Sequence, residues 1–289
     1  MPLSSFVKIR PRNDALFVSR GRSVLITAPD GFVHSDSRQG LFVHETRLLS
    51  KYRYLLNQEE FQPIVLSNIE QHSWLGYYIQ LIPEMKHGTL AGSGRVPKKS
   101  EHSIELLVHR TVGEGLHEDL RVTNFNQTST SFSLDIEVDA DFADTEELPD
   151  KRKQFGDLTR AWRKGDRGRW ELYFDYRASH HYDHQGNVGN ASLHRGLIIR
   201  VRESDSEPHL HGSSIRFDLT LKPHQTWHAE LDFTPLVEDR THEGRDQLHV
   251  LQVDPAEFDE KRRSFLSSST SLEIPGKDSL VPVVGAALE

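Results

Sequence analysis

The 289-residue chain is long enough to bury about three quarters of the surface that its unfolded form would expose. Its net charge of −8, from 43 acidic and 35 basic residues, argues against a nucleic-acid-binding or anionic-membrane-binding protein. The absence of cysteine excludes disulfides and thiolate metal sites. The N-terminal residues lack the apolar run of a signal peptide, and no segment has the roughly 20 apolar residues of a membrane helix. We therefore expect a cytoplasmic protein with no membrane or nucleic-acid partner.

Alternation of apolar and polar residues with a period of two prevails along the chain, and this pattern is typical of strands. The first turn between strands is predicted at Pro29-Asp30-Gly31, because proline presets φ and glycine tolerates positive φ. Further strands are predicted at Gln62–Ser67, Tyr77–Ile82, Ile104–Arg110, Leu120–Asn124, Ser131–Val138, Trp170–Tyr176, Leu197–Val201, Ile215–Leu221 and Thr226–Phe233. Because many short strands alternate with turns and not with long helices, the sequence predicts an all-β fold, a large antiparallel β-sandwich.

Two parts of the chain depart from this pattern. The acidic segment Asp139–Asp150 carries six carboxylates and precedes eight basic residues in Lys151–Arg169, which favours an ion-paired surface excursion. Short helices are predicted at Leu158–Trp162 and at Pro255–Phe265, the latter from its early proline and acidic-to-basic order. Since the strand pattern ends near residue 255, we predict a sandwich domain over residues 1–254. Residues 255–289 are predicted to form a short helix and a linker.

Residues that could carry chemistry are common, yet no spacing selects a catalytic group. Asp139 and Asp141 would share one strand face about 7 Å apart. Glycoside hydrolysis can use that separation, but solvated carboxylates at a strand end are the simpler interpretation. Histidines gather in the expected loop His180–His184 and at His209 and His211, where we expect surface side chains and not a metal site. No cofactor is indicated.

Aromatic side chains offer flat rings on which the C–H face of a sugar can pack. Trp74 and Tyr77, in the stretch HSWLGYY, are therefore candidate substrate-binding residues. The alternative is that these large rings fill the core of the sandwich, as aromatic side chains generally do.

The stretch Gly40–Asn57, GLFVHETRLLSKYRYLLN, resembles the Gly-aromatic…Asp-Thr-Arg-x-Leu-Ser pattern of one family. That family is the N-terminal domain of bacterial glycogen-debranching enzymes of the amylo-α-1,6-glucosidase type. A second motif, Asn124 followed by Asp141-Phe142-Ala143-Asp144, resembles the strand–turn–strand element that the family has downstream. Glu45 stands where the family usually has aspartate, and the residues after Asp144 differ from the family's acidic-aromatic continuation. The resemblance covers about residues 15–240.

The resemblance implies a galactose-mutarotase-like supersandwich with few short helices. In such enzymes the general acid and base belong to an (α/α)6 toroid that follows the sandwich, and residues 255–289 would lead toward it. The resemblance thus implies a noncatalytic domain that supports the C-terminal catalytic domain of the same protein and contacts α-glucan. Two alternatives stay open, a freestanding mutarotase-like enzyme with an acid and a base in one cleft, and a carbohydrate-binding module.

The polar cluster His44-Glu45-Thr46-Arg47 lies between two strand-like runs, and we interpret it as a structural corner. Arginine offers five donors in a rigid fork that suits a carboxylate or several backbone carbonyls. We predict that Arg47 is a structural clamp whose partner is Glu45 or an acid of the Asp141–Asp144 element, Asp141 or Asp144.

Overall fold

A computed structural model describes residues 14–35, 37–81, 103–148, 155–165, 169–184, 187–237, 240–241, 264 and 267–268. The chain divides into two units, Met1–Gly244 and Arg245–Glu289. Residues 245–254 lie outside the described part, so the domain boundary at residue 254 stays a prediction. No helix in the described part has the length and apolar character needed to cross a membrane.

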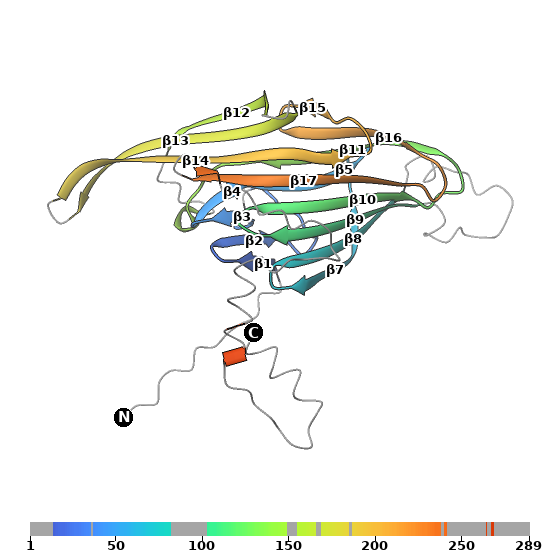
Figure 1. Ribbon diagram of the computed structural model, residues 1–289, viewed down its shortest axis with the longest axis horizontal. Helices are drawn as coiled ribbons and strands as arrows, with labels where there is room; N and C mark the ends of the chain where they lie inside the picture. Colours follow the sequence, from blue (N-terminus) through green and yellow to red (C-terminus); the bar gives the residue numbers. More distant parts are fainter. Residues whose placement is uncertain are drawn as a thin grey trace, which may run out of the picture. The chain divides into compact units, whose positions relative to one another are not determined.

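The first unit consists of antiparallel strands (Figure 1). Its strands are β1 Leu16–Arg20, β2 Ser23–Thr27, β3 Gly40–Val43, β4 Thr46–Leu49, β5 Lys51–Leu56, β6 Glu59–Glu60, β7 Gln62–Glu70, β8 Ser73–Leu81, β9 Ser103–Val112, β10 Leu116–Asn124, β11 Thr130–Asp139, β12 Asp157–Lys164, β13 Trp170–His184, β14 Asn187–Ser204, β15 His209–His211, β16 Ser214–Leu221, β17 Thr226–Val237 and β18 Arg240–Thr241. A short 3-10 helix spans Thr145–Glu147. The predicted all-β antiparallel fold is confirmed.

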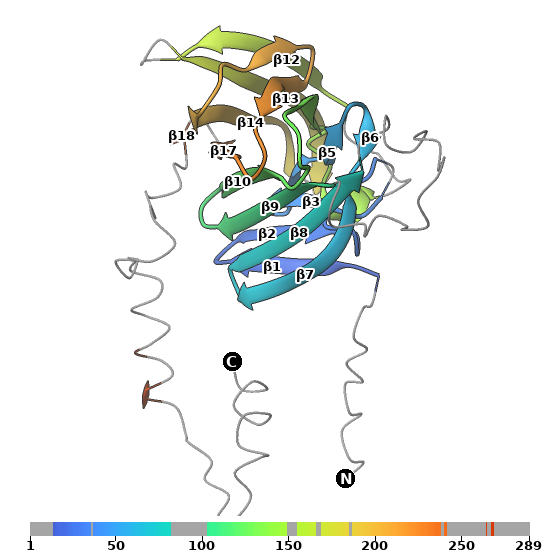
Figure 2. The same ribbon diagram turned by 90° about the vertical axis from the view of Figure 1, so that its right-hand side faces the viewer.

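The strands form three sheets. The largest has the order β12-β13-β14-β17-β10-β9-β8-β7, with β18 paired to β17. A five-stranded sheet has the order β15-β16-β11-β5-β6, and a four-stranded sheet the order β1-β2-β3-β4. Strand β1 lies next to β8 and β9, and β2 lies next to β9 (Figure 2).

The core lies between the inward faces of these sheets, where the period-two pattern places apolar side chains. Leu120 and Leu231 from the nine-stranded sheet belong to the same buried cluster as Ile136 and Phe217 from the five-stranded sheet. On the opposite side of the five-stranded sheet, Arg53 forms ion pairs with Glu60 and Glu137. The alternation in the sequence therefore separates a continuous core from a charged outer surface.

The helix predicted at Leu158–Trp162 is wrong, because these residues belong to strand β12. They pair residue by residue with β13, from Leu158 opposite Tyr176 to Trp162 opposite Leu172. Leu158 and Trp162 both pack against the core, and their spacing of four positions fits a strand as well as a helix. Pairing with β13 decides between the two. Of the predicted helix Pro255–Phe265, only Ser264 is described, and it is helical.

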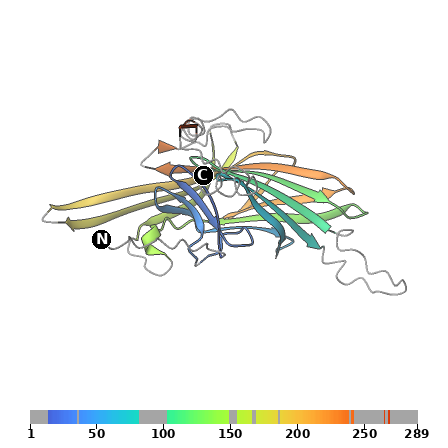
Figure 3. The ribbon, with the colours of Figure 1, turned by 90° about the horizontal axis from the view of Figure 1, so that it is seen from below.

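The loop predicted around His180–His184 is also wrong. These residues end β13, and their pairing with β14 continues without a break to His184 opposite Asn187. The paired ends of β13 and β14 extend beyond the other strands of the sheet (Figure 3). A polar sequence here forms a hairpin because the ladder hydrogen bonds do not require apolar side chains.

Candidate functional site

Strands β3 and β4 meet at a tight corner made by His44 and Glu45. Both residues have positive φ, 48° and 65°, as a two-residue hairpin turn of type I′ requires. The Glu45 side chain is exposed, and its backbone carbonyl accepts a hydrogen bond of 3.1 Å from the Thr145 N–H. Arg47 follows the corner and is buried, and its carboxylate partner is Asp141 and not Glu45.

The Arg47 guanidinium joins three segments of the chain. Its Nε donates to Asp141 Oδ1 at 3.0 Å, and a second nitrogen donates to Asp141 Oδ2. The third nitrogen donates to the backbone carbonyls of Ser37 and Gln39, at 2.6 and 3.2 Å. This geometry is the bidentate fork for which arginine is suited. Its energetic importance as a clamp stays a prediction that a stability measurement can test.

The other motif residues have local roles in the same corner. Asp144 caps the 3-10 helix by accepting from the Glu146 N–H at 2.9 Å, and Glu147 accepts from the Asp144 N–H at 3.1 Å. Gly40 has φ of +149°, and a Cβ there would lie 2.4 Å from the Leu49 carbonyl oxygen. The motif glycine is therefore required for β3 to approach β4 and the Arg47 side chain.

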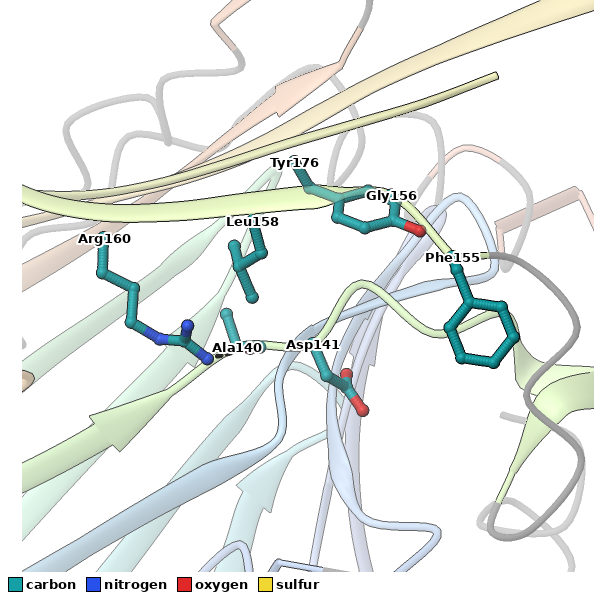
Figure 4. A pocket seen from close by; sticks show the side chains of 7 residues that line it. All are labelled: Ala140, Asp141, Phe155, Gly156, Leu158, Arg160 and Tyr176. Atoms are coloured by element: carbon teal, nitrogen blue, oxygen red, sulfur yellow. Dashed lines mark hydrogen bonds between the residues drawn. The ribbon is translucent and has the colours of Figure 1, made fainter. Parts of the chain in front are cut away.

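A surface cavity of about 280 Å³ lies beside this corner (Figure 4). Arg160 and Phe155 lie at its two ends, and Asp141 lies between them. Its remaining lining residues are Ala140, Gly156, Leu158 and Tyr176. The cavity thus combines one carboxylate, one guanidinium and an exposed aromatic ring, and the carboxylate is the one that Arg47 holds.

The structure corrects the expectation that Trp74 contacts a substrate. Its side chain is 1% exposed, and the Arg110 guanidinium lies 4.5 Å from its ring centroid inside the core. No face of the ring is open to a sugar, so the core alternative holds for Trp74. Tyr77 points to the other side of β8 and is half-buried. Burial, followed by its hydrogen bond to Glu105 and the charge of that residue, raises the pKa of Tyr77 to about 12. Its role in binding stays a prediction.

A buried polar network, not expected from the sequence, lies in the core. Arg110 and Glu118 are directly opposite on β9 and β10, and both are fully buried. Arg110 Nε donates to Glu118 Oε1 at 2.5 Å, while Tyr52 and Tyr54 donate their hydroxyls to Oε2. Another Arg110 nitrogen donates to the Gly31 carbonyl at 2.5 Å.

Burial and the negative charge of Glu118 raise the pKa of both tyrosine hydroxyls. Tyr52 and Tyr54 therefore remain protonated donors. Every guanidinium nitrogen of Arg110 and every carboxylate oxygen of Glu118 has a hydrogen-bond partner. The period-two alternation of the sequence contains the signal for this network, because it places both charged residues at core-facing positions. Arg110 stands between Val108 and Val112 on the apolar face of its strand. Glu118 has the corresponding position in β10.

The outer face of the nine-stranded sheet carries a band of histidines and carboxylates. His117 and Asp232 are opposite in register on β10 and β17, and His117 Nδ1 donates to Asp232 Oδ1 at 2.7 Å. His228 Nε2 lies 3.2 Å from Asp119 Oδ1 and 4.0 Å from Glu230 Oε1. These side chains could accept or donate protons at one surface. Among the residues that the structure describes, no three ligand side chains are placed to hold a metal ion.

This band makes folding stability depend on pH. Burial lowers the pKa of His117, but the hydrogen bond and charge of Asp232 outweigh it, and the net pKa is raised. The resulting stabilisation is complete below the unfolded pKa of about 6.5 and is lost as pH rises through the folded pKa. We expect the wild-type protein to have a higher free energy of unfolding than His117→Gln in urea titrations. This difference should be largest below about pH 6. A difference between the two proteins that is constant from pH 5 to 9 would contradict the assignment.

The three sheets, the Arg47 corner and the cavity define a large antiparallel β-sandwich protein. Residues 18–232 match the model of a family described as the N-terminal domain of (some) glycogen debranching enzymes. The chain belongs to this family. Among curated proteins, none matches it.

Three of the solved structures that match this chain have low sequence identity to it. A galactose mutarotase-like protein from Clostridium acetobutylicum is 7% identical, with a TM-score of 0.40 over 77% of this chain and 95% of that one. A putative kojibiose phosphorylase from the human microbiome is 10% identical, with a TM-score of 0.38 over 79% of this chain and 26% of that one. A polysaccharide lyase is 14% identical, with a TM-score of 0.29 over 82% and 34% of the two chains.

Proposed function

We propose that this chain is a noncatalytic domain of a cytoplasmic glycoside hydrolase of the amylo-α-1,6-glucosidase type. In this proposal it supports the catalytic C-terminal domain of the same protein and contacts α-glucan. The family match over residues 18–232 carries the proposal, because the family is described as a domain of glycogen debranching enzymes.

The carboxylates near the cavity support a noncatalytic role. Glycoside hydrolysis generally uses two carboxyl groups, one on each side of the scissile bond. The cavity has one carboxylate in its lining, Asp141, and Arg47 occupies both of its oxygens. The neighbouring Asp139 lies in an ion pair of 2.9 Å with Arg160. Both acids thus have structural partners, and Asp141 is the only acid among the described residues that line the cavity.

Exposed apolar side chains support a docking role for one edge of the sandwich. Ile64, Val65 and Ile69 on the edge strand β7 are each more than half exposed. Phe17 on β1 is 39% exposed and adjacent, since Asn68 donates to its backbone carbonyl at 2.8 Å. The opposite edge strand, β12, instead carries three basic residues, which discourage pairing. Such an exposed apolar group suits a protein neighbour, and we assign it to the catalytic domain.

The coding region beyond Glu289 tests this support role. We expect it to continue for several hundred residues with apolar positions at the helical period of 3.6. A stop codon directly after Glu289 would contradict a support role within one polypeptide and leave a stand-alone carbohydrate-binding module as the better candidate.

A second candidate is a freestanding mutarotase-like sugar enzyme, which the histidine band on β10 and β17 favours. His228 and Glu230 would act as a general base and acid if a sugar ring lay on this face. Polarimetry of freshly dissolved aldoses tests it. Acceleration by the wild type that is lost in both His228→Gln and Glu230→Gln would support this candidate over the first.

A further inference from the structure

We propose that the cavity at Asp141, Phe155 and Arg160 is the α-glucan-binding subsite of this domain. The inference rests on the proposed glucan contact and gives it a location and a ligand class, a neutral pyranose unit. A volume of about 280 Å³ is close to the lower limit of about 300 Å³ for small-molecule sites. The cavity therefore suits one or two sugar rings and not an extended chain.

The polar groups of the cavity are fixed before any ligand arrives. Arg47 holds the Asp141 carboxylate, whose side chain is still 34% exposed. Asp139 holds Arg160 at 2.9 Å, a second Arg160 nitrogen donates to the Ala140 carbonyl at 3.4 Å, and the side chain is 40% exposed. Each side chain thus remains partly exposed to solvent. A ligand would lose less side-chain entropy on binding to such restrained groups than to free ones.

The two polar groups complement sugar hydroxyls. A carboxylate only accepts hydrogen bonds and a guanidinium only donates them. A hydroxyl does both, so neighbouring hydroxyls of one ring can bond Asp141 and Arg160 together. Among the described residues at the cavity, the pairs Arg47–Asp141 and Arg160–Asp139 also balance in charge. A neutral polyol therefore fits the cavity better than a phosphate or a carboxylate ligand, whose charge would remain uncompensated.

The aromatic ring of Phe155 forms the apolar side of the cavity and is unusually exposed. Phe155 is 78% exposed, the highest value among the exposed large apolar side chains of the described residues. Leu158 and the buried Tyr176 line the cavity nearby, and Tyr176 is stacked on Phe142 with ring centroids 5.4 Å apart. A pyranose ring can cover Phe155 with its C–H face while its hydroxyls reach Asp141. Covering an exposed aromatic ring removes apolar area from water and so favours binding.

Affinity electrophoresis in gels containing glycogen, together with calorimetric titration of maltoheptaose, tests the subsite. We expect wild type to bind both probes, and Phe155→Ala and Arg160→Gln each to weaken binding about tenfold or more. Trp170→Ala is the matched control, because it removes another exposed aromatic ring outside the cavity. This control should bind like wild type. Thermal melts should show that all variants remain folded, since the altered side chains are exposed.

The contrary results are distinct. If wild type binds glycogen and both cavity variants bind equally well, the subsite is wrong and the glucan contact lies elsewhere. If wild type binds neither probe, the subsite and the glucan contact are both wrong, while the coding-region test still decides the support role. If anionic polygalacturonate binds as tightly as glycogen, the assignment to a neutral sugar is wrong.

Discussion

Replacing Glu118 by alanine is expected to lower the free energy of unfolding by about 3–5 kcal/mol, because it leaves a buried arginine without its counter-charge. Because Arg110 is fully buried, water does not replace the lost carboxylate as its partner. The Tyr52 and Tyr54 hydroxyls would also lose their shared acceptor. Denaturation in urea, analysed by linear extrapolation, measures the loss. Glu207→Ala, at an exposed loop position, is the control and should change stability by no more than about 0.5 kcal/mol.

The same network makes a second variant informative. Replacing both charges with apolar residues of similar size, Arg110→Met with Glu118→Leu, removes the unpaired charge along with its partner. Such double replacements are often neutral or stabilising where the single removal is costly. The double variant should therefore recover part of the stability that Glu118→Ala loses, because it removes the unpaired charge but still leaves the Tyr52 and Tyr54 hydroxyls without their acceptor. A loss below about 1 kcal/mol for Glu118→Ala alone would show that water or rearrangement satisfies Arg110, contrary to the buried geometry.

Arg47→Ala is expected to cost about 2–3 kcal/mol, the scale of hydrogen bonds to charged groups at a partly buried site. The variant loses the fork to Asp141 and both bonds to the segment before β3. The value stays below that for Glu118→Ala because Asp141 is one third exposed and water can solvate its freed oxygens.

Arg53→Ala provides the matched control for this substitution. Arg53 lies on the neighbouring strand β5 and has two carboxylate partners, but its side chain is 30% exposed. Exposed ion pairs generally contribute about 0–1 kcal/mol. Urea denaturation should therefore rank Arg47→Ala as clearly more destabilising. Equal losses for the two variants would mean that Arg47 is an ordinary surface ion pair and not a clamp.

The strands could be predicted because period-two alternation follows directly from which face of each strand is buried. Ile104–Arg110 and Leu120–Asn124, for example, lie inside β9 and β10, where buried and less buried residues alternate. The helix prediction at Leu158–Trp162 was wrong for a physical reason. Apolar residues four positions apart satisfy both periods, and only the partner strand decides, which local sequence does not contain.

The site residues show the same limit. The reach of Arg47 to Asp141, 94 positions away, was one of several predicted pairings, and the three-dimensional fold selects among them. Trp74 could equally have filled the core or bound a sugar, since an aromatic ring suits both environments. The cavity was not predicted, because it assembles residues 140–141, 155–160 and 176 from three segments. Phe155 in particular has no pattern in the sequence that marks it as exposed.

The central claim, that this sandwich serves a glucan-processing enzyme without catalysing hydrolysis itself, is tested most directly by one assay. The purified chain is incubated with glycogen limit dextrin, and free glucose is measured over time. We predict no release above that of a protein-free blank. Glucose release that depends on the chain and is lost in Asp141→Asn would contradict the account and make the cavity an active site.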